Sequence, residues 1–143
     1  ISQIAIGGDT AFTRACEEVG FLQRIFLPQP LDSYLTAVGS AGPDFTPEQR
    51  RKAESLLESQ HVIQTRVVSD SADRHERFGD VNLEIARVSD VVICVVRAEQ
   101  NSKSGGTHEL ADFARKRQRP VILLEVGVGP DGSPVITCQD GCD

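Results

Sequence analysis

The sequence predicts an α/β protein with an open, doubly wound, mainly parallel sheet and helices on both of its faces. Two unbroken aliphatic runs, at residues 91–96 and 121–126, are bounded by turn residues and separated by a helical pattern. Such runs are typical of strands buried on both faces, and two of them joined by a helix form a right-handed βαβ unit. We therefore expect both segments to be central parallel strands, adjacent or nearly so, with Ile93 and Leu123 buried.

The first half of the chain alternates helical and strand patterns. Apolar residues at helical spacing predict a first helix that ends at Gly20, and residues 21–27 form the next strand, which a proline closes. A helix then begins at Thr46, because Thr46 is a good N-cap, a proline follows it, and Gln49 completes a capping box. Residues 62–68 predict a further strand.

The second half continues this alternation. Apolar residues recur at helical spacing over residues 78–88, and another helix starts near Thr107. A turn rich in glycine then leads to a short edge strand at Val135 and Ile136. Because strands alternate with helices along the whole length without an internal repeat, we expect a single domain over residues 1–143.

Composition and charge exclude several classes of function. The chain has 143 residues, of which 39% are hydrophobic, and this is enough to bury a core. Its net charge of −6 argues against nucleic acid as a partner, because neutralising phosphates needs a basic field. No stretch approaches the ~20 apolar residues of a membrane span, and no signal peptide opens the chain, so we expect a cytoplasmic protein.

The cysteines and one basic cluster have structural interpretations. Cys16 and Cys94 occupy core-facing positions, where we expect small buried side chains. Cys138 and Cys142 could chelate a metal or pair with each other, but we interpret them as part of a mobile tail. The basic cluster at residues 115–119 falls at the carboxyl end of a helix, where cations complement the helix dipole. We expect neither a metal site nor a cofactor.

Two glycine turns carry the strongest indication of function. The first turn comprises Gly7, Gly8, Asp9 and Thr10, and the second comprises Gly105, Gly106 and Thr107. Each lies between an apolar run, residues 4–6 or 91–96, and a helix, at the carboxyl edge of the expected sheet, where ligands bind in sheets of this kind. The first N–H groups of a helix attract anions, and glycine lets a phosphate approach the backbone. We expect both turns to face the same edge of the sheet.

Residues of neighbouring loops extend this candidate site. Arg97, Lys103 and Ser104 precede the second glycine turn, and cations at such a position can clamp a phosphate. Pro28 ends a strand at the same expected edge. Asp90 precedes its strand instead, so we assign it to the opposite edge and to a structural role.

The ordered set of these motifs resembles the SLOG superfamily, a Rossmann-like group that includes the LOG phosphoribohydrolases and sensor domains of bacterial signalling and anti-phage proteins. The match covers nearly the whole chain and consists of Gly7, Gly8 and Asp9, a strand ending in Leu27 and Pro28, a strand introduced by Ser89 and Asp90, and Gly105, Gly106 and Thr107 opening a helix that ends before Arg119. This resemblance implies a Rossmann-like fold and a nucleotide or nucleotide-derived ligand.

Two departures from the family pattern bear on function. Family members usually begin with a further strand and glycine loop, so we interpret this chain as lacking its first strand or as cut from a larger protein. The enzymes of the family carry their catalytic Glu three residues after the Thr of the second motif, and here that position is Leu110. Glu109 lies one residue earlier, which rotates it by about 100° on a helix.

We therefore predict a non-catalytic sensor domain that binds a nucleotide or an NAD-derived signal. Backbone N–H groups of both glycine turns would hold phosphates, and Asp9 or Glu109 would accept ribose hydroxyls. The alternative is a nucleotide phosphoribohydrolase or a deoxyribosyltransferase-like hydrolase with Glu109 as its working carboxylate. A third reading is an interaction module without a ligand. The expected partner is a small-molecule nucleotide, with no nucleic acid and no membrane, and we expect a homo-oligomer or part of a larger multidomain protein.

Overall fold

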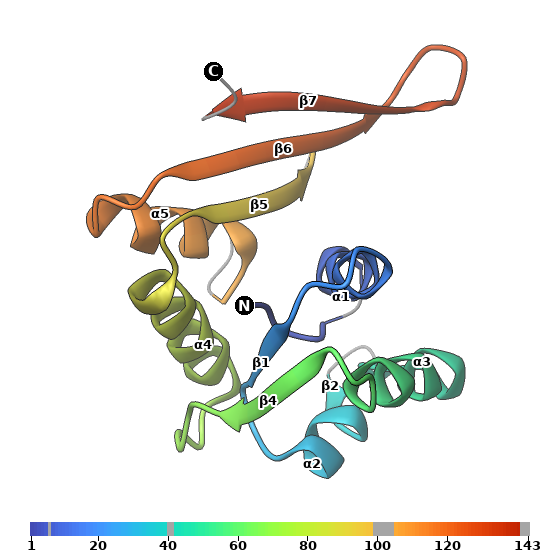
Figure 1. Ribbon diagram of the computed structural model, residues 1–143, viewed down its shortest axis with the longest axis vertical. Helices are drawn as coiled ribbons and strands as arrows, with labels where there is room; N and C mark the ends of the chain where they lie inside the picture. Colours follow the sequence, from blue (N-terminus) through green and yellow to red (C-terminus); the bar gives the residue numbers. More distant parts are fainter. Residues whose placement is uncertain (6, 40–41, 99–104, 141–143) are drawn as a thin grey trace. The chain divides into compact units, whose positions relative to one another are not determined.

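The computed structural model describes all residues except 6, 40–41, 99–104 and 141–143 (Figure 1). The chain divides into two compact units, Ile1–Asp70 and Ser71–Asp143. Each unit contains helices and a small sheet, so the predicted α/β class is confirmed. A single domain with one doubly wound sheet stays a prediction.

The first unit is built around a short parallel sheet. Its elements in chain order are α1 (Gly8–Glu18), β1 (Gln23–Leu27), α2 (Leu31–Leu35), β2 (Val38–Gly39), β3 (Gly42–Pro43), α3 (Pro47–Leu57) and β4 (Val62–Val67) (Figure 1). Strands β1 and β4 pair in parallel, and β2 and β3 form a small antiparallel pair. A single parallel bridge also joins Ser2 to Ile25 of β1, so β1 has neighbours on both sides.

Strand β1 is the most deeply buried strand of this unit. Ile25, Phe26 and Leu27 are at most 3% exposed, and because successive side chains of a strand point to opposite faces, β1 is covered on both faces. The strand begins at Gln23 rather than at residue 21. The two residues before it follow the predicted helix stop at Gly20, which has a φ of 75°, and they remain exposed.

Of the predictions for the helices of the first unit, one is confirmed in full and one in part. The capping box of α3 forms as predicted: the Gln49 N–H donates to Thr46 Oγ1 over 3.3 Å, and the Thr46 N–H donates to Gln49 Oε1 over 2.8 Å. In α1, Cys16 is buried and Phe12 is 41% exposed, and Val19, the C-cap residue after the helix, is 64% exposed. Only part of the expected apolar stripe of α1 therefore reaches the core.

The second unit contains a three-stranded mixed sheet. Its elements are α4 (Arg74–Val88), β5 (Val92–Arg97), α5 (Thr107–Lys116), β6 (Val121–Val128) and β7 (Pro134–Asp140) (Figure 1). The strand order is β5-β6-β7, with β5 and β6 parallel and β7 antiparallel to β6. The predicted βαβ unit with adjacent parallel strands at 91–96 and 121–126 is confirmed.

The expectation that both faces of these strands are buried is wrong for β5. Val92, Cys94 and Val96 are at most 3% exposed, but Ile93 and Val95 are 50% and 43% exposed. One face of the sheet packs against helices, in a core formed by Ala86, Val92, Cys94, Ala111, Ala114 and Val121 with Leu110, Phe113 and Leu123 at its margin. Among the described residues of this unit, no second layer covers the other face.

Strand β7 also corrects the sequence expectations. It extends over Pro134–Asp140 and is therefore longer than the predicted edge strand. Cys138 lies in β7 and is disulfide-bonded, so its interpretation as part of a mobile tail is wrong, while Cys142 lies outside the described residues. Cys16 and Cys94 are buried, as expected, and neither forms a disulfide bond. In the described part of the chain, no helix is long and apolar enough to cross a membrane.

Candidate ligand-binding site

The first glycine turn, in the first unit, is open. Gly7 is the N-cap of α1 with a φ of 102° and a ψ of −117°, a conformation that glycine tolerates and other residues avoid. Its N–H donates to Thr10 Oγ1 over 3.3 Å, and the Thr10 hydroxyl donates to the Gly7 carbonyl oxygen over 3.0 Å. Among the described residues, a Cβ at Gly7 would meet no atom within 4 Å beyond its chain neighbours. A ligand can therefore approach this backbone closely.

Asp9 lies in the first turn of α1 and carries a perturbed carboxyl. Burial raises the pKa of Asp9 to about 6, and a hydrogen bond with the Ala5 backbone offsets part of the rise. Part of the side chain stays exposed. A helix N-terminus favours a charged carboxylate, so the raised pKa means that loss of hydration outweighs the helix dipole at this position.

The second glycine turn, in the second unit, is closed by its surroundings. Gly105 has a φ of 72°, and a Cβ added to it would lie 2.8 Å from the Cβ of Phe78 in α4. The Gly105 N–H donates to Glu109 Oε2 over 2.9 Å. The side chain of Asn82, also from α4, donates to the Gly106 carbonyl oxygen over 3.1 Å and to Glu109 Oε2 over 3.4 Å. Packing and hydrogen bonds thus hold this turn in place.

Glu109 acts locally as a cap of α5. It is the third residue of the helix, and its carboxylate reaches back to the N–H of the residue before the N-cap. Like a capping-box residue, it satisfies a backbone donor at the helix start. One oxygen of this carboxylate therefore already accepts from both Gly105 and Asn82.

The helices that follow the glycine turns lack the N-cap side chain that α3 and α4 carry. Helices α1 and α5 begin after Gly7 and Gly106, whose positions supply no N-cap side chain, and the short helix α2 after Pro30 also has none. Helix α3 is capped by Thr46, and α4 is capped by Asp73, whose Oδ1 accepts the N–H groups of two first-turn residues. The first turns of α1 and α5 thus lack the N-cap acceptor that stabilises α3 and α4.

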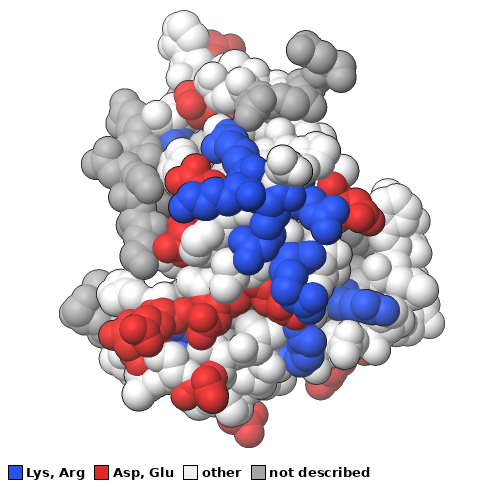
Figure 2. Space-filling view, turned by 90° about the vertical axis from the view of Figure 1, so that its left-hand side faces the viewer, with Lys and Arg blue, Asp and Glu red and all other residues white. Residues whose placement is uncertain are grey.

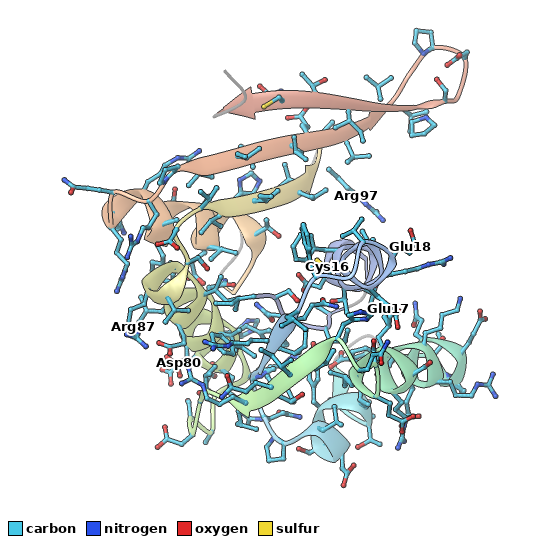
Figure 3. All side chains as sticks on the ribbon, viewed as in Figure 1. Cys16, Glu17, Glu18, Asp80, Arg87 and Arg97 are labelled. Carbon is cyan, nitrogen blue, oxygen red and sulfur yellow. The ribbon has the colours of Figure 1, made fainter. Side chains whose placement is uncertain are left out.

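The remaining predicted site residues take different positions. Gly8 and Thr107 are the first residues of α1 and α5, and the Thr107 carbonyl oxygen lies 3.7 Å from Cys94 Sγ. Pro28 is less than 2% exposed, so its side chain is part of the core. Arg97 is exposed at the carboxyl end of β5 (Figure 3). Lys103 and Ser104 lie outside the described residues.

Asn82 is a functional candidate that the sequence interpretation missed. It is 2% exposed, and it connects α4 to the second glycine turn. A signal was present in the sequence, because Asn82 follows Phe78 by four residues and precedes Ile85 by three, which places it on the apolar face of the helix. A polar residue on such a face needs a hydrogen-bond partner.

Charged residues elsewhere in the second unit have structural partners. Asp90 precedes β5, and its carboxylate lies 3.9 Å from the guanidinium of Arg119, which precedes β6. The assignment of Asp90 to the edge opposite the glycine turn is confirmed. Arg115 at the carboxyl end of α5 pairs with Asp112 over 3.5 Å. Figure 2 shows Lys and Arg side chains gathered in a band on one face, with acidic side chains beside them.

Neither a metal site in the described residues nor a known relative indicates a function for this chain. In the described residues, no three or more His, Cys, Asp or Glu side chains are arranged to hold a metal ion. Comparison with protein-family models, with curated proteins and with solved structures finds no match for this chain. The chemistry of the two glycine turns is therefore the basis for a functional proposal.

Proposed function

We propose that this protein is a cytoplasmic sensor domain that binds the phosphate groups of a nucleotide or an NAD-derived signal. The observation that carries the proposal is the start of α1 at Gly7 and of α5 at Gly106 without a side-chain cap. First-turn N–H groups that have no N-cap acceptor suit an anion, and the helix dipole favours it. The open space at Gly7 supports close approach of a phosphate to the backbone.

The side chains near the first turn support recognition of a sugar. Because its pKa is raised to about 6, the carboxyl of Asp9 is present in both protonation states close to neutral pH. It can therefore accept a hydrogen bond from a ribose hydroxyl or donate one to it. In the second turn the Gly105 N–H is engaged by Glu109, so phosphate binding there rests on the first-turn N–H groups of α5.

Ligand binding is favoured over hydrolysis by the surroundings of Glu109. A carboxylate that attacks or activates a sugar must be aimed at the ligand with sub-ångström accuracy. The Glu109 carboxylate is instead directed to the backbone of its own turn and to Asn82. Cleavage of the bond between base and sugar, with Glu109 as the working carboxylate, stays the alternative.

Membership of the SLOG group and a single doubly wound sheet belong to the same proposal. Each unit supplies one parallel strand pair connected through a helix, with α3 between β1 and β4 and α5 between β5 and β6. Such pairs are the building blocks of a doubly wound sheet. The resemblance in the order of motifs supports the same reading.

Thermal unfolding with a nucleotide panel tests the proposal. The panel contains nucleoside monophosphates, NAD and ADP-ribose, each added to the full chain with inorganic phosphate as the reference anion. A ligand at 100 times its dissociation constant stabilises the folded state by about 2.7 kcal/mol, which gives a readily measured shift. We expect Gly7→Ala to abolish the shift, because its methyl group occupies the space open to a phosphate.

Gly132→Ala is the matched control. Gly132 also has a positive φ, of 80°, and open space around a Cβ, but it lies in the turn between β6 and β7. The nucleotide shift should survive this substitution. No shift with any member of the panel contradicts the proposal, and release of a free base that is lost in Glu109→Gln establishes the hydrolase instead.

A further inference from the structure

Among the described residues of the second unit, no helix or strand packs on one apolar face of the sheet. Three cross-strand pairs define it: Ile93 with Ile122, Val95 with Leu124, and Val126 with Ile136. Directly paired residues point to the same side of a sheet. These six side chains therefore form one continuous surface across β5, β6 and β7, and we refer to this surface as the open face.

Exposure distinguishes the open face from the face that packs on α5. Ile93, Val95 and Ile136 are 50%, 43% and 65% exposed. Their neighbours in sequence on β5, Val92 and Cys94, are at most 3% exposed, because they belong to the core beneath α5. The alternation along β5 is therefore one of burial and not of polarity, since both sets of residues are apolar.

The area of the open face is large for the surface of a monomer. Ile93, Val95 and Ile136 are about half exposed, and Ile122, Leu124 and Val126 are partly buried. With the exposed Val128 and Pro134 beside them, these residues present an apolar patch on the order of 500 Å². The largest apolar patches on monomers are about 300–600 Å² and often mark interfaces. Two such faces would bury about 1,000 Å², the size at which a specific interface begins to be stable.

We propose that the open face packs against the open face of a second copy of this chain. Two twisted sheets pack well face to face at about 10 Å with their strands within about 30° of each other. Arg97 pairs directly with Val126 and therefore lies on the open face, at the end of β5. A two-fold arrangement with antiparallel strands places the two Arg97 side chains at opposite ends, so no like charges meet. The proposal is independent of nucleotide binding.

Sedimentation velocity of the full chain between about 5 and 500 µM tests this dimer. An interface of this size is expected to dissociate in the micromolar range, so the chain should change from monomer to dimer across the series. The double variant Ile93→Thr and Val95→Thr keeps β-branched side chains in an exposed strand and removes apolar surface. It should weaken association at least tenfold without loss of the folded state.

Leu22→Thr is the matched control, since Leu22 is 67% exposed in the first unit and lies outside the open face. It should associate as the wild type does. A wild-type chain that stays monomeric at 500 µM overturns the proposal, because another segment or partner then covers the face. Association that survives the double Thr variant, or that is lost in Leu22→Thr, overturns it as well.

Discussion

The two glycine turns look alike in sequence and differ in their surroundings. Both place a glycine with positive φ just before a helix that lacks a side-chain cap. At Gly7 the space next to the backbone is open, whereas at Gly105 it is filled by Phe78. The N–H of Gly7 is bonded within its own turn, and that of Gly105 is held by Glu109, which Asn82 also contacts.

This difference separates two reasons for a glycine. At Gly105 the neighbouring helix leaves no room for a side chain, so glycine is required for packing. At Gly7 only the backbone conformation requires glycine, and the space it leaves is available to a ligand. A glycine turn at a helix start therefore indicates a phosphate site only where the space beside its backbone is open.

The largest expected effect is the loss of stability in Gly105→Ala. The left-handed φ costs about 1–2 kcal/mol for a residue other than glycine, and a Cβ placed 2.8 Å from Phe78 adds about 1–3 kcal/mol of overpacking. We expect the free energy of unfolding to fall by about 3 kcal/mol, measured by urea denaturation and circular dichroism. Gly7→Ala carries the backbone cost alone and should lose less. If Gly105→Ala and Gly7→Ala lose the same free energy of unfolding, the second turn is no more closed to a side chain than the first.

Asn82→Ala should have the next largest effect. The substitution removes the hydrogen bonds that Asn82 donates to the Gly106 carbonyl oxygen and to the Glu109 carboxylate, worth about 0.5–1.5 kcal/mol for the neutral acceptor and about 1.5–3 kcal/mol for the charged one. We expect about 2 kcal/mol in urea denaturation. Arg87→Ala is the control on the same helix: the exposed Arg87 (Figure 3) pairs with Glu84 within α4 and, among the described residues, has no hydrogen bond to the second glycine turn, so its loss should cost less than the loss of Asn82. If Asn82→Ala is as stable as Arg87→Ala, the second glycine turn does not depend on the hydrogen bonds of Asn82.

The effect of Asp9, in the first glycine turn, on the free energy of unfolding is expected to be smaller than the effects of Gly105→Ala and Asn82→Ala, and to depend on pH. The pKa of Asp9 is about 6 in the folded chain against 3.8 for an exposed carboxyl, so the folded state holds its proton more tightly. Its contribution therefore favours folding at low pH, and this advantage is lost as the pH rises from about 4 to 6. Because the side chain is partly exposed, we expect Asp9→Asn to stabilise the chain at pH 7.5 by about 1–2 kcal/mol.

The measurement is the free energy of unfolding at a series of pH values for wild type and Asp9→Asn. The two should agree below pH 4 and diverge above it. Asp32→Asn is the control, since Asp32 is an exposed carboxylate in the first turn of α2. Its loss should slightly destabilise that helix through the dipole. A pH profile unchanged by Asp9→Asn contradicts the assignment of a buried carboxyl to the open turn.

Much of the fold could be predicted because its signals are local. The parallel pairing of β5 with β6 follows from two apolar runs joined by a helix, and the cap at Thr46 follows from residues within one helical turn. The burial of β5 was predicted wrongly on one face. An apolar run shows that a strand avoids water on both sides, but it does not show which element of the fold covers each side.

By itself, the sequence determined most of the longer helices and strands and that two helices begin at glycine, because these features depend on residues only a few positions apart. It did not predict α2 or the β2–β3 pair, or the full length of β7. Only the tertiary structure decided that the second turn is closed and the first is open. Asn82 is 24 residues from Gly106 and 27 from Glu109, and such side chains meet only after α4 and α5 pack together. That packing depends on long-range burial, which local spacing does not encode.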